Sequence, residues 1–249
     1  MTRKHKEEPM RPSLSALILT LGVASPSLAG EPTADDLLRR ATAILAPEEF
    51  DAQITFTTHK ASGEVKHFAI QMWKKGADRT RFKFLSPADD RDMEVLRVGD
   101  EMWNYLPNLK RSLRVSPKQE FHGGDFSNAD VLRVDLPRDY SPVLGRAGVP
   151  GEQLLELTAK NDQVAYYRVR LWVRAKDAMP LREEFYSRAG KLLRKLEFAA
   201  PKAYGRLVRP SRYVMQNMLV AARSTEMEWT AMRVARPDDG LFLMASLGR

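Results

Sequence analysis

The histidines are the residues of this 249-residue chain with the most versatile chemistry, and there are four of them. His59 and His67 lie on either side of a predicted turn, with no third metal ligand near them in the sequence. His122 precedes two glycines and would need a nucleophile to act as a general base, but no Gly-x-Ser-x-Gly motif or ordered triad signature accompanies it. We therefore expect neither a metal site nor a hydrolytic triad.

Acid and thiol chemistry is indicated no more strongly. Glu183 and Glu184 are neighbours in a predicted strand, so their side chains project to opposite faces and do not make a paired-acid site. The chain has no cysteine, which excludes disulfides, thiolate catalysis and cysteine-based metal sites. Phosphate-binding glycine motifs are also missing from the sequence. We therefore expect that the protein is not an enzyme and binds no cofactor. A hydrolase without a recognisable motif is the third alternative, after the two functions given at the end of this section.

Several arginines alternate with apolar residues in predicted strands, and their role needs an explanation. We expect these arginines on the solvent-facing side of a sheet. The alternative is contact with lipid headgroups, a phosphorylated saccharide or an anionic membrane partner, because guanidinium binds phosphate with paired hydrogen bonds. The residues are Arg79, Arg81, Arg111, Arg114, Arg168, Arg170, Arg174, Arg209 and Arg212.

The amino terminus predicts export. Basic residues precede an apolar run over residues 14–23, and small residues ending at Ala29 fit a cleavage site. A membrane anchor is the alternative, but a spanning helix needs about twenty apolar residues. We predict a signal peptide over residues 1–29, cleaved near Ala29, with Met10 as an alternative start. Residues 30–249 are then a single periplasmic domain, a location that argues against a nucleic-acid partner despite the net charge of +8.

Most of the chain after residue 50 alternates apolar and polar residues with a period of two, which predicts about ten or eleven antiparallel strands. One helix is predicted over residues 33–45, capped by Thr33, and a short closing helix over residues 241–247. Residues 137–151 are rich in proline and glycine, which favours a long irregular excursion. The predicted fold class is mainly β with a few helices.

Residues 102–132 carry the most specific pattern. Alternating aromatics in Met-Trp-Asn-Tyr-Leu lead through a Pro-Asn turn into a basic strand, and the two strands form one predicted hairpin. Gly123 and Gly124 then allow backbone angles closed to other residues, and Ser127 or Asn128 is placed to cap a short helix. The phenylalanines on either side of the glycines are either the tip of a lid over cargo or the anchors of an ordinary loop.

The order MW-x-YLP-x-L-x-R-x-x-R-x-S, a spacer and F-x-GGDFS-x-x-D resembles the periplasmic outer-membrane lipoprotein-sorting proteins, the LolA-like family in its broad sense. The resemblance covers roughly residues 35–247. It implies a curved, half-open antiparallel β-barrel with helices as a lid over an apolar cavity that carries an acyl chain.

In a barrel of about ten strands, we expect the protein's own side chains to leave part of the interior empty. Apolar and aromatic residues at alternate strand positions are therefore candidates for the cavity wall, although methionines among them are also ordinary core fillers. The cavity candidates are Phe68, Ile70, Met72, Phe82, Phe84, Trp103, Tyr105, Tyr167, Val169, Leu171, Met227 and Trp229. The lid candidates are Phe121, Gly123, Gly124, Asp125 and Phe126.

The predicted function is that of a monomeric periplasmic carrier for the acyl chains of a lipoprotein or for a free lipid. Burying an acyl chain at about 0.8 kcal/mol per methylene contributes on the order of 10 kcal/mol before ordering costs. The resemblance suggests an inner-membrane transporter as a partner. The alternative is an envelope-stress sensor or scaffold that uses the same fold to bind a partner protein.

Overall fold

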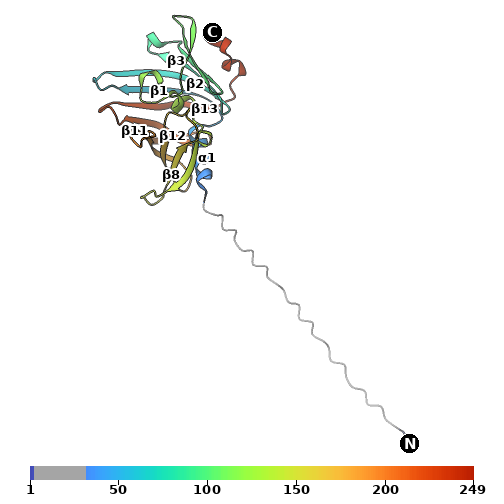
Figure 1. Ribbon diagram of the computed structural model, residues 1–249. Coiled ribbons are helices and arrows are strands. Elements are labelled where there is room, and N and C mark those ends of the chain that lie inside the picture. Colours follow the sequence, from blue (N-terminus) through green and yellow to red (C-terminus); the bar gives the residue numbers. More distant parts are fainter. Residues whose placement is uncertain (3–31) are drawn as a thin grey trace. The chain divides into compact units, whose positions relative to one another are not determined.

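The alternating pattern builds one sheet of thirteen antiparallel strands, as the computed structural model shows (Figure 1). The structure describes residues 1–2 and 32–249, so nearly all of the predicted signal peptide lies outside the described residues. Within the described part of the chain, no helix is long and apolar enough to cross a membrane.

The strand order follows the chain in two runs. β6 to β1 are consecutive neighbours, β13 to β7 continue in the same direction, and the runs join where β1 pairs with β13. β6 and β7 are the two edges, so the sheet curls without closing (Figure 1). The mainly antiparallel, half-open architecture is confirmed, although ten or eleven strands was too low a number. The strands are β1 Glu49–His59, β2 Val65–Lys75, β3 Arg79–Ser86, β4 Glu94–Val98, β5 Glu101–Leu106, β6 Arg111–Arg114, β7 Tyr140–Gly145, β8 Glu152–Ala159, β9 Arg168–Arg174, β10 Pro180–Tyr186, β11 Leu192–Tyr204, β12 Leu207–Asn217 and β13 Ser224–Val234.

The main core lies on the inner face of this sheet. Phe56 on β1 is opposite Phe68 on β2, and Met72 on β2 is opposite Phe82 on β3. All four side chains are buried in one cluster. Because successive residues of a strand face opposite sides, the register places every second residue of these strands inside.

The helices that cover the inner face begin at the predicted caps. α1 (Ala34–Leu45) follows Thr33, whose side chain accepts a hydrogen bond from the amide of Asp36. α2 (Asn128–Leu132) follows Ser127 with the same reciprocal pattern. α1 contacts α3 (Leu136–Asp139) and strands β7, β10 and β12. The remaining helical turns are η1 (Ala88–Asp90), η2 (Phe121–Gly123), η3 (Asp239–Phe242) and η4 (Met244–Ser246).

Residues 137–151 are more regular than predicted. They contain most of α3, with Pro137 in its first turn, and all of the edge strand β7, which includes Pro142. Proline is tolerated in both places, because the first turn of a helix and one side of an edge strand have amide positions that need no partner.

A second, smaller cluster packs on the outer face of β3 to β5. Leu96, Phe242 and Leu247 form its centre, with Trp103 and Tyr105 against them. The structure thus places Trp103 and Tyr105 on the outer face of the sheet. The predicted closing helix over residues 241–247 is instead two short turns, η3 and η4, which pack on this face. The carboxy-terminal segment covers these two aromatic side chains, and Met102 and Leu106 of the same strand pack against the main core on the opposite face.

Candidate functional site

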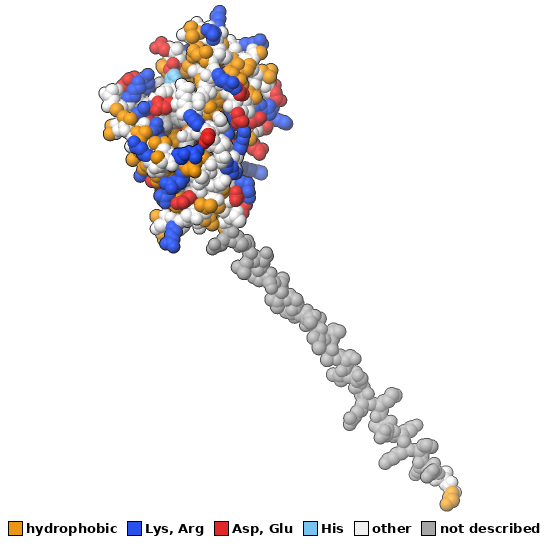
Figure 2. Space-filling model, viewed as in Figure 1, with side chains coloured by type: hydrophobic (Ala, Val, Ile, Leu, Met, Phe, Trp, Pro, Cys, Tyr) orange, Lys and Arg blue, Asp and Glu red, His pale blue; other side chains and the backbone are white. Residues whose placement is uncertain are grey.

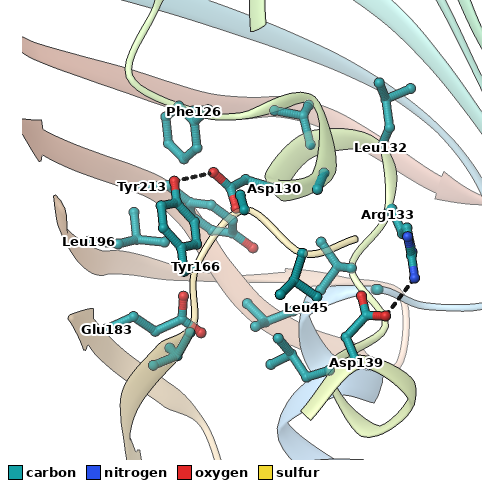
Figure 3. A pocket seen from close by; sticks show the side chains of 18 of the residues that line it. Leu45, Phe126, Asp130, Leu132, Arg133, Asp139, Tyr166, Glu183, Leu196 and Tyr213 are labelled. Carbon is teal, nitrogen blue, oxygen red and sulfur yellow. Dashed lines mark hydrogen bonds and ion pairs between the residues drawn. The ribbon is translucent and has the colours of Figure 1, made fainter. Parts of the chain in front are cut away.

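A cavity of about 90 Å³ opens between α2 and the inner face of β9 to β13 (Figure 3). Most of its wall is apolar. Side chains from widely separated segments meet there, including Leu45 at the end of α1, Leu132 on α2 and Leu196 on β11. The curl of the sheet brings these segments together, since none of them is a neighbour of the others in sequence.

The predicted cavity residues divide into three groups. Met72, Val169, Met227 and Trp229 line this cavity, as does Phe126 from the predicted lid. Phe68, Ile70, Phe82, Phe84 and Leu171 are buried in the core but are not part of the cavity wall. Trp103, Tyr105 and Tyr167 face away from it; the guanidinium of Arg188 lies 4.4 Å from the ring centroid of Tyr167.

Tyr166, not Tyr167, is the tyrosine that points inward. It lines the cavity, is buried, and packs with its ring centroid 4.4 Å from that of Phe185. Adjacent tyrosines in an extended segment face opposite sides, so only one of the two can line the cavity. The nearby Val169 faces inward, but the segment before β9 is not a regular strand, and counting by two from Val169 selects the wrong tyrosine.

Three carboxyl groups line this largely apolar cavity, those of Asp130, Asp139 and Glu183, and none of them is among the cavity residues predicted from the sequence. The Asp130 carboxylate accepts hydrogen bonds from the Ser127 amide at 2.7 Å and the Tyr166 hydroxyl at 2.9 Å. Loss of hydration raises the pKa of Asp130. Asp130 therefore has its partners, and it also completes the cap of α2.

Glu183 is another of these carboxyl groups, and its side chain points into the cavity (Figure 3). The residue is 6% exposed, and its carboxyl has no hydrogen-bond or ion-pair partner among the described residues. Burial, with a smaller contribution from the charge of Asp130, raises the pKa of Glu183 to about 8. Its spacing of two from the inward Phe185 is the sequence signal for this position.

An arginine without a carboxylate partner lies behind the cavity wall. Arg209 is fully buried, and its guanidinium lies 3.7 Å from the ring centroid of Trp229. It donates hydrogen bonds to the Leu45 carbonyl oxygen at 2.9 Å and to the Tyr213 hydroxyl. Arg209 and the buried Arg81, which pairs with Glu94, are corrections to the expectation that these arginines face solvent.

The cations at the cavity rim already have partners. Arg133 forms an ion pair with Asp139 on α3 (Figure 3). Lys74 donates hydrogen bonds of 2.8 Å to the carbonyl oxygens of Pro47 and Gly76. Burial, followed by the charge of Arg97, lowers the pKa of Lys74 to about 8. In the described part of the chain, Glu183 is therefore the one charged side chain of the cavity wall that forms neither a hydrogen bond nor an ion pair.

Beside the cavity, the flap fills the part of the interior that lies over β1 to β3. The ring of Phe121 lies 5.4 Å from that of Phe56, 5.6 Å from Phe82 and 6.0 Å from Phe68, measured between centroids. The two lid phenylalanines thus differ: Phe121 anchors the loop in the core, and Phe126 lines the cavity. A second cavity of about 160 Å³ lies between the flap and β4 to β5, next to His122.

A buried polar network fastens the flap to β12 and β13. The Asp125 carboxylate accepts hydrogen bonds from Asn217 Nδ2 at 2.8 Å and Thr225 Oγ1 at 3.1 Å, and it pairs with Arg223 at 3.1 Å. Gly124 sits so close to the sheet that a Cβ there would lie 3.1 Å from Thr225 Oγ1. The close approach and the network together hold the loop against the strands.

The described residues hold no group of three or more histidine, aspartate or glutamate side chains arranged to bind a metal ion. His122 Nε2 lies 3.0 Å from an Asp90 carboxylate oxygen at the flap, and the centroid of the His122 ring lies 4.8 Å from those of Phe68 and Phe84. This arrangement ties the flap to η1.

The chain matches a family model and shares its fold with known proteins. A family model described only as an uncharacterized protein matches residues 76–249. No curated protein matches the sequence. A LolA superfamily protein from Nitrosomonas europaea is 26% identical, with a TM-score of 0.79 over 86% of this chain and 99% of that chain.

Two further solved structures share the fold. A DUF1329 family protein from Desulfovibrio piger is 22% identical, with a TM-score of 0.78 over 87% of this chain and 99% of that one. An outer membrane lipoprotein-sorting protein domain from Vibrio parahaemolyticus is also 22% identical, with a TM-score of 0.75 over 87% and 98% of the two chains. The open thirteen-stranded sheet, its helical cover and these similarities lead to one conclusion: the chain belongs to the uncharacterized family whose model matches residues 76–249, and its fold is LolA-like.

Proposed function

We propose that this protein is a carrier that holds the acyl chain of a lipoprotein or a free lipid in the cavity beneath α2. The observation that supports this most strongly is the apolar cavity itself, which lies inside a fold shared with lipoprotein-sorting proteins. Each methylene buried there contributes about 0.8 kcal/mol, so even part of a chain gives useful affinity. No step of such a function requires a catalytic group.

Loading requires movement of the cover. A cavity of about 90 Å³ is well below the roughly 300 Å³ at which ligand pockets begin, so a long chain enters only if the cover shifts. α2 is the element best suited to move, because it has only five residues and is followed by a short connection to α3. Phe126, which precedes α2 and lines the cavity, would move with it.

The proposed setting is the periplasm, after removal of residues 1–29. On the face that Figure 2 shows, basic side chains are mixed with acidic and apolar ones, which does not favour nucleic acid as a partner. We propose that residues 30–249 act as one monomeric carrier domain and that an inner-membrane transporter supplies the lipid.

The test is extraction of the full chain, purified without detergent, followed by mass spectrometry of the bound lipid. Val169→Phe replaces a small aliphatic side chain on β9 with a phenyl ring that occupies the cavity, and it should abolish lipid retention. Arg168→Phe introduces the same ring at the exposed neighbour on the same strand and should retain the wild-type amount.

Near-stoichiometric lipid in the wild type and in Arg168→Phe, with none in Val169→Phe, supports the carrier. Wild-type protein that is empty after production in lipid-rich cells, and that takes up no lipid from vesicles, overturns it. In that case the alternative of a sensor or scaffold predicts a peptide ligand instead.

A further inference from the structure

Glu183 is the one cavity side chain whose chemistry the carrier function leaves unexplained. It lies on β10 between strands that bury apolar residues, is 94% hidden from solvent, and points into the empty space (Figure 3). No described residue forms a hydrogen bond or an ion pair with its carboxyl group, which faces the cavity. A buried acid without a partner is destabilising, so a purely structural role would favour an apolar side chain here.

The other ionisable groups around the cavity are engaged elsewhere. Asp130 accepts from Tyr166 and from the cap of α2. The hydroxyl of Tyr140 donates to the Tyr166 carbonyl oxygen at 3.1 Å, and that of Tyr213 meets Arg209. The rim groups Lys74, Arg133 and Asp139 have the partners described above. Among the described ionisable side chains of the wall, Glu183 alone forms neither a hydrogen bond nor an ion pair; the indole N–H of Trp229 is a second buried donor without a partner.

Its surroundings favour the neutral acid. Burial and the negative charge of Asp130 both oppose ionisation of Glu183, and no cation offsets them. A neutral carboxyl group has one O–H donor, and in this cavity that donor lacks an acceptor.

We propose that Glu183, in its protonated form, donates a hydrogen bond to an acceptor oxygen at the head of the acyl chain, such as an ester carbonyl. This deepens the proposed function and rests on it: the cavity would prefer esterified acyl chains to chains that end in an ammonium group. The alternative, a site for a cationic lipid, would require Glu183 to ionise beside Asp130 without a cation of the protein to offset the charge.

The experiment compares two ligands with chains of the same length, methyl laurate and dodecylamine. Each displaces the fluorescent apolar probe N-phenyl-1-naphthylamine from the full chain, at about pH 6.5 and about pH 9, on either side of the Glu183 pKa of about 8. The variants are Glu183→Gln, which keeps a donor but cannot ionise, and Glu183→Leu, which has no donor. Glu184→Gln is the matched control, because Glu184 is on the same strand but faces outward toward Arg170 and Lys195.

Wild type and Glu184→Gln should bind methyl laurate about tenfold more weakly at the higher pH, since ionisation removes the donor. Glu183→Gln should bind the ester with no such pH dependence. Glu183→Leu should bind the ester about fivefold more weakly than Glu183→Gln, which corresponds to one hydrogen bond.

Three outcomes would overturn the inference. Equal ester affinity in Glu183→Leu and wild type means that Glu183 makes no contact, while the carrier function stands. Preference for dodecylamine, lost in Glu183→Gln, identifies a cation site instead. Failure of the wild type to bind the probe or either ligand overturns the carrier function itself, and the inference with it.

Discussion

The two halves of the sheet interior are filled in different ways. Under the flap, Phe121 packs among the phenylalanines of β1 to β3 and is 3% exposed, so the flap fills the space over these strands, and the second cavity lies to one side, against β4 and β5. Under α2, the wall includes Glu183, Asp130 and three tyrosines around empty space. A carboxyl group beside empty space lowers stability, whereas a ring in the core raises it. The contrast suggests that only the α2 half is kept for a ligand.

Phe121→Ala should have the largest effect on stability, because it removes the ring that fills the space between the flap and β1 to β3. We expect a loss of about 4 kcal/mol in the free energy of unfolding, typical for truncation of a buried phenylalanine that leaves a cavity. Urea denaturation of the purified chain measures it.

The comparison variant is Leu196→Ala, on the wall of the open cavity. Here the lost contacts lie beside space that is already empty, so the loss should be about 2 kcal/mol, at the low end for a buried leucine. Equal losses at the two sites would mean that the two halves are packed alike, and the comparison would fail.

Glu183→Gln should have the next largest effect, and it should be stabilising. Because the folded-state pKa of about 8 lies above the ordinary value of 4.5, the folded protein holds a proton that the unfolded chain releases as pH rises between these values. The wild type therefore loses stability across this range, on the order of 3 kcal/mol between about pH 5 and pH 8, and the glutamine variant does not.

Thermal or urea unfolding of both proteins at several pH values checks this. The difference between variant and wild type should grow with pH and level off above about pH 8. A difference that stays constant with pH would show that Glu183 is ionised and solvated in the folded state.

Much of the fold could be predicted from local pattern. Period-two alternation identified most strands, and hydroxyl caps at Thr33 and Ser127 correctly placed α1 and α2, because these signals act over a few residues. β7 was missed because its proline argues against a strand, and only its position at the sheet edge, a property of the whole topology, makes Pro142 acceptable.

The site was harder to predict, because which face of a strand is inside depends on distant segments. Trp103 and Tyr105 are covered from outside by the last turns of the chain, which nothing in the hairpin itself reveals. The pattern of the sequence predicts only that Glu183 and Glu184 do not form a paired-acid site. The spacing of two between Glu183 and Phe185 is what indicates that Glu183 faces inward. A buried ionisable group is an exception to hydrophobic patterning, and Glu183 is one that faces the cavity.

Asp125→Asn tests the polar network that holds the flap, which lies between the two halves of the interior. The change removes the charge that pairs with Arg223 but keeps the size of the side chain, and it should cost about 2 kcal/mol, as for a charged hydrogen bond. Hydrogen exchange of the flap amides should become faster, because the network fastens the loop to β12 and β13.

The control for this variant is Asp90→Asn, at the other attachment of the flap. Asp90 meets His122 at a half-exposed position, where screening keeps such contacts below about 1 kcal/mol. If both substitutions loosen the flap equally, the buried network is not what holds it.

Ser127→Ala should give the smallest change in stability and the most selective one. It removes the hydroxyl that accepts from the Asp130 amide at 3.2 Å and so should cost about 1 kcal/mol. Thr33→Ala removes the equivalent cap of α1 and should cost a similar amount. Only α2 carries Asp130 into the cavity, so only Ser127→Ala should lower the retention of lipid. Equal retention in the two variants, measured by mass spectrometry of extracts, would show that α2 contributes to the cavity as an inert cover and not as part of its recognition surface.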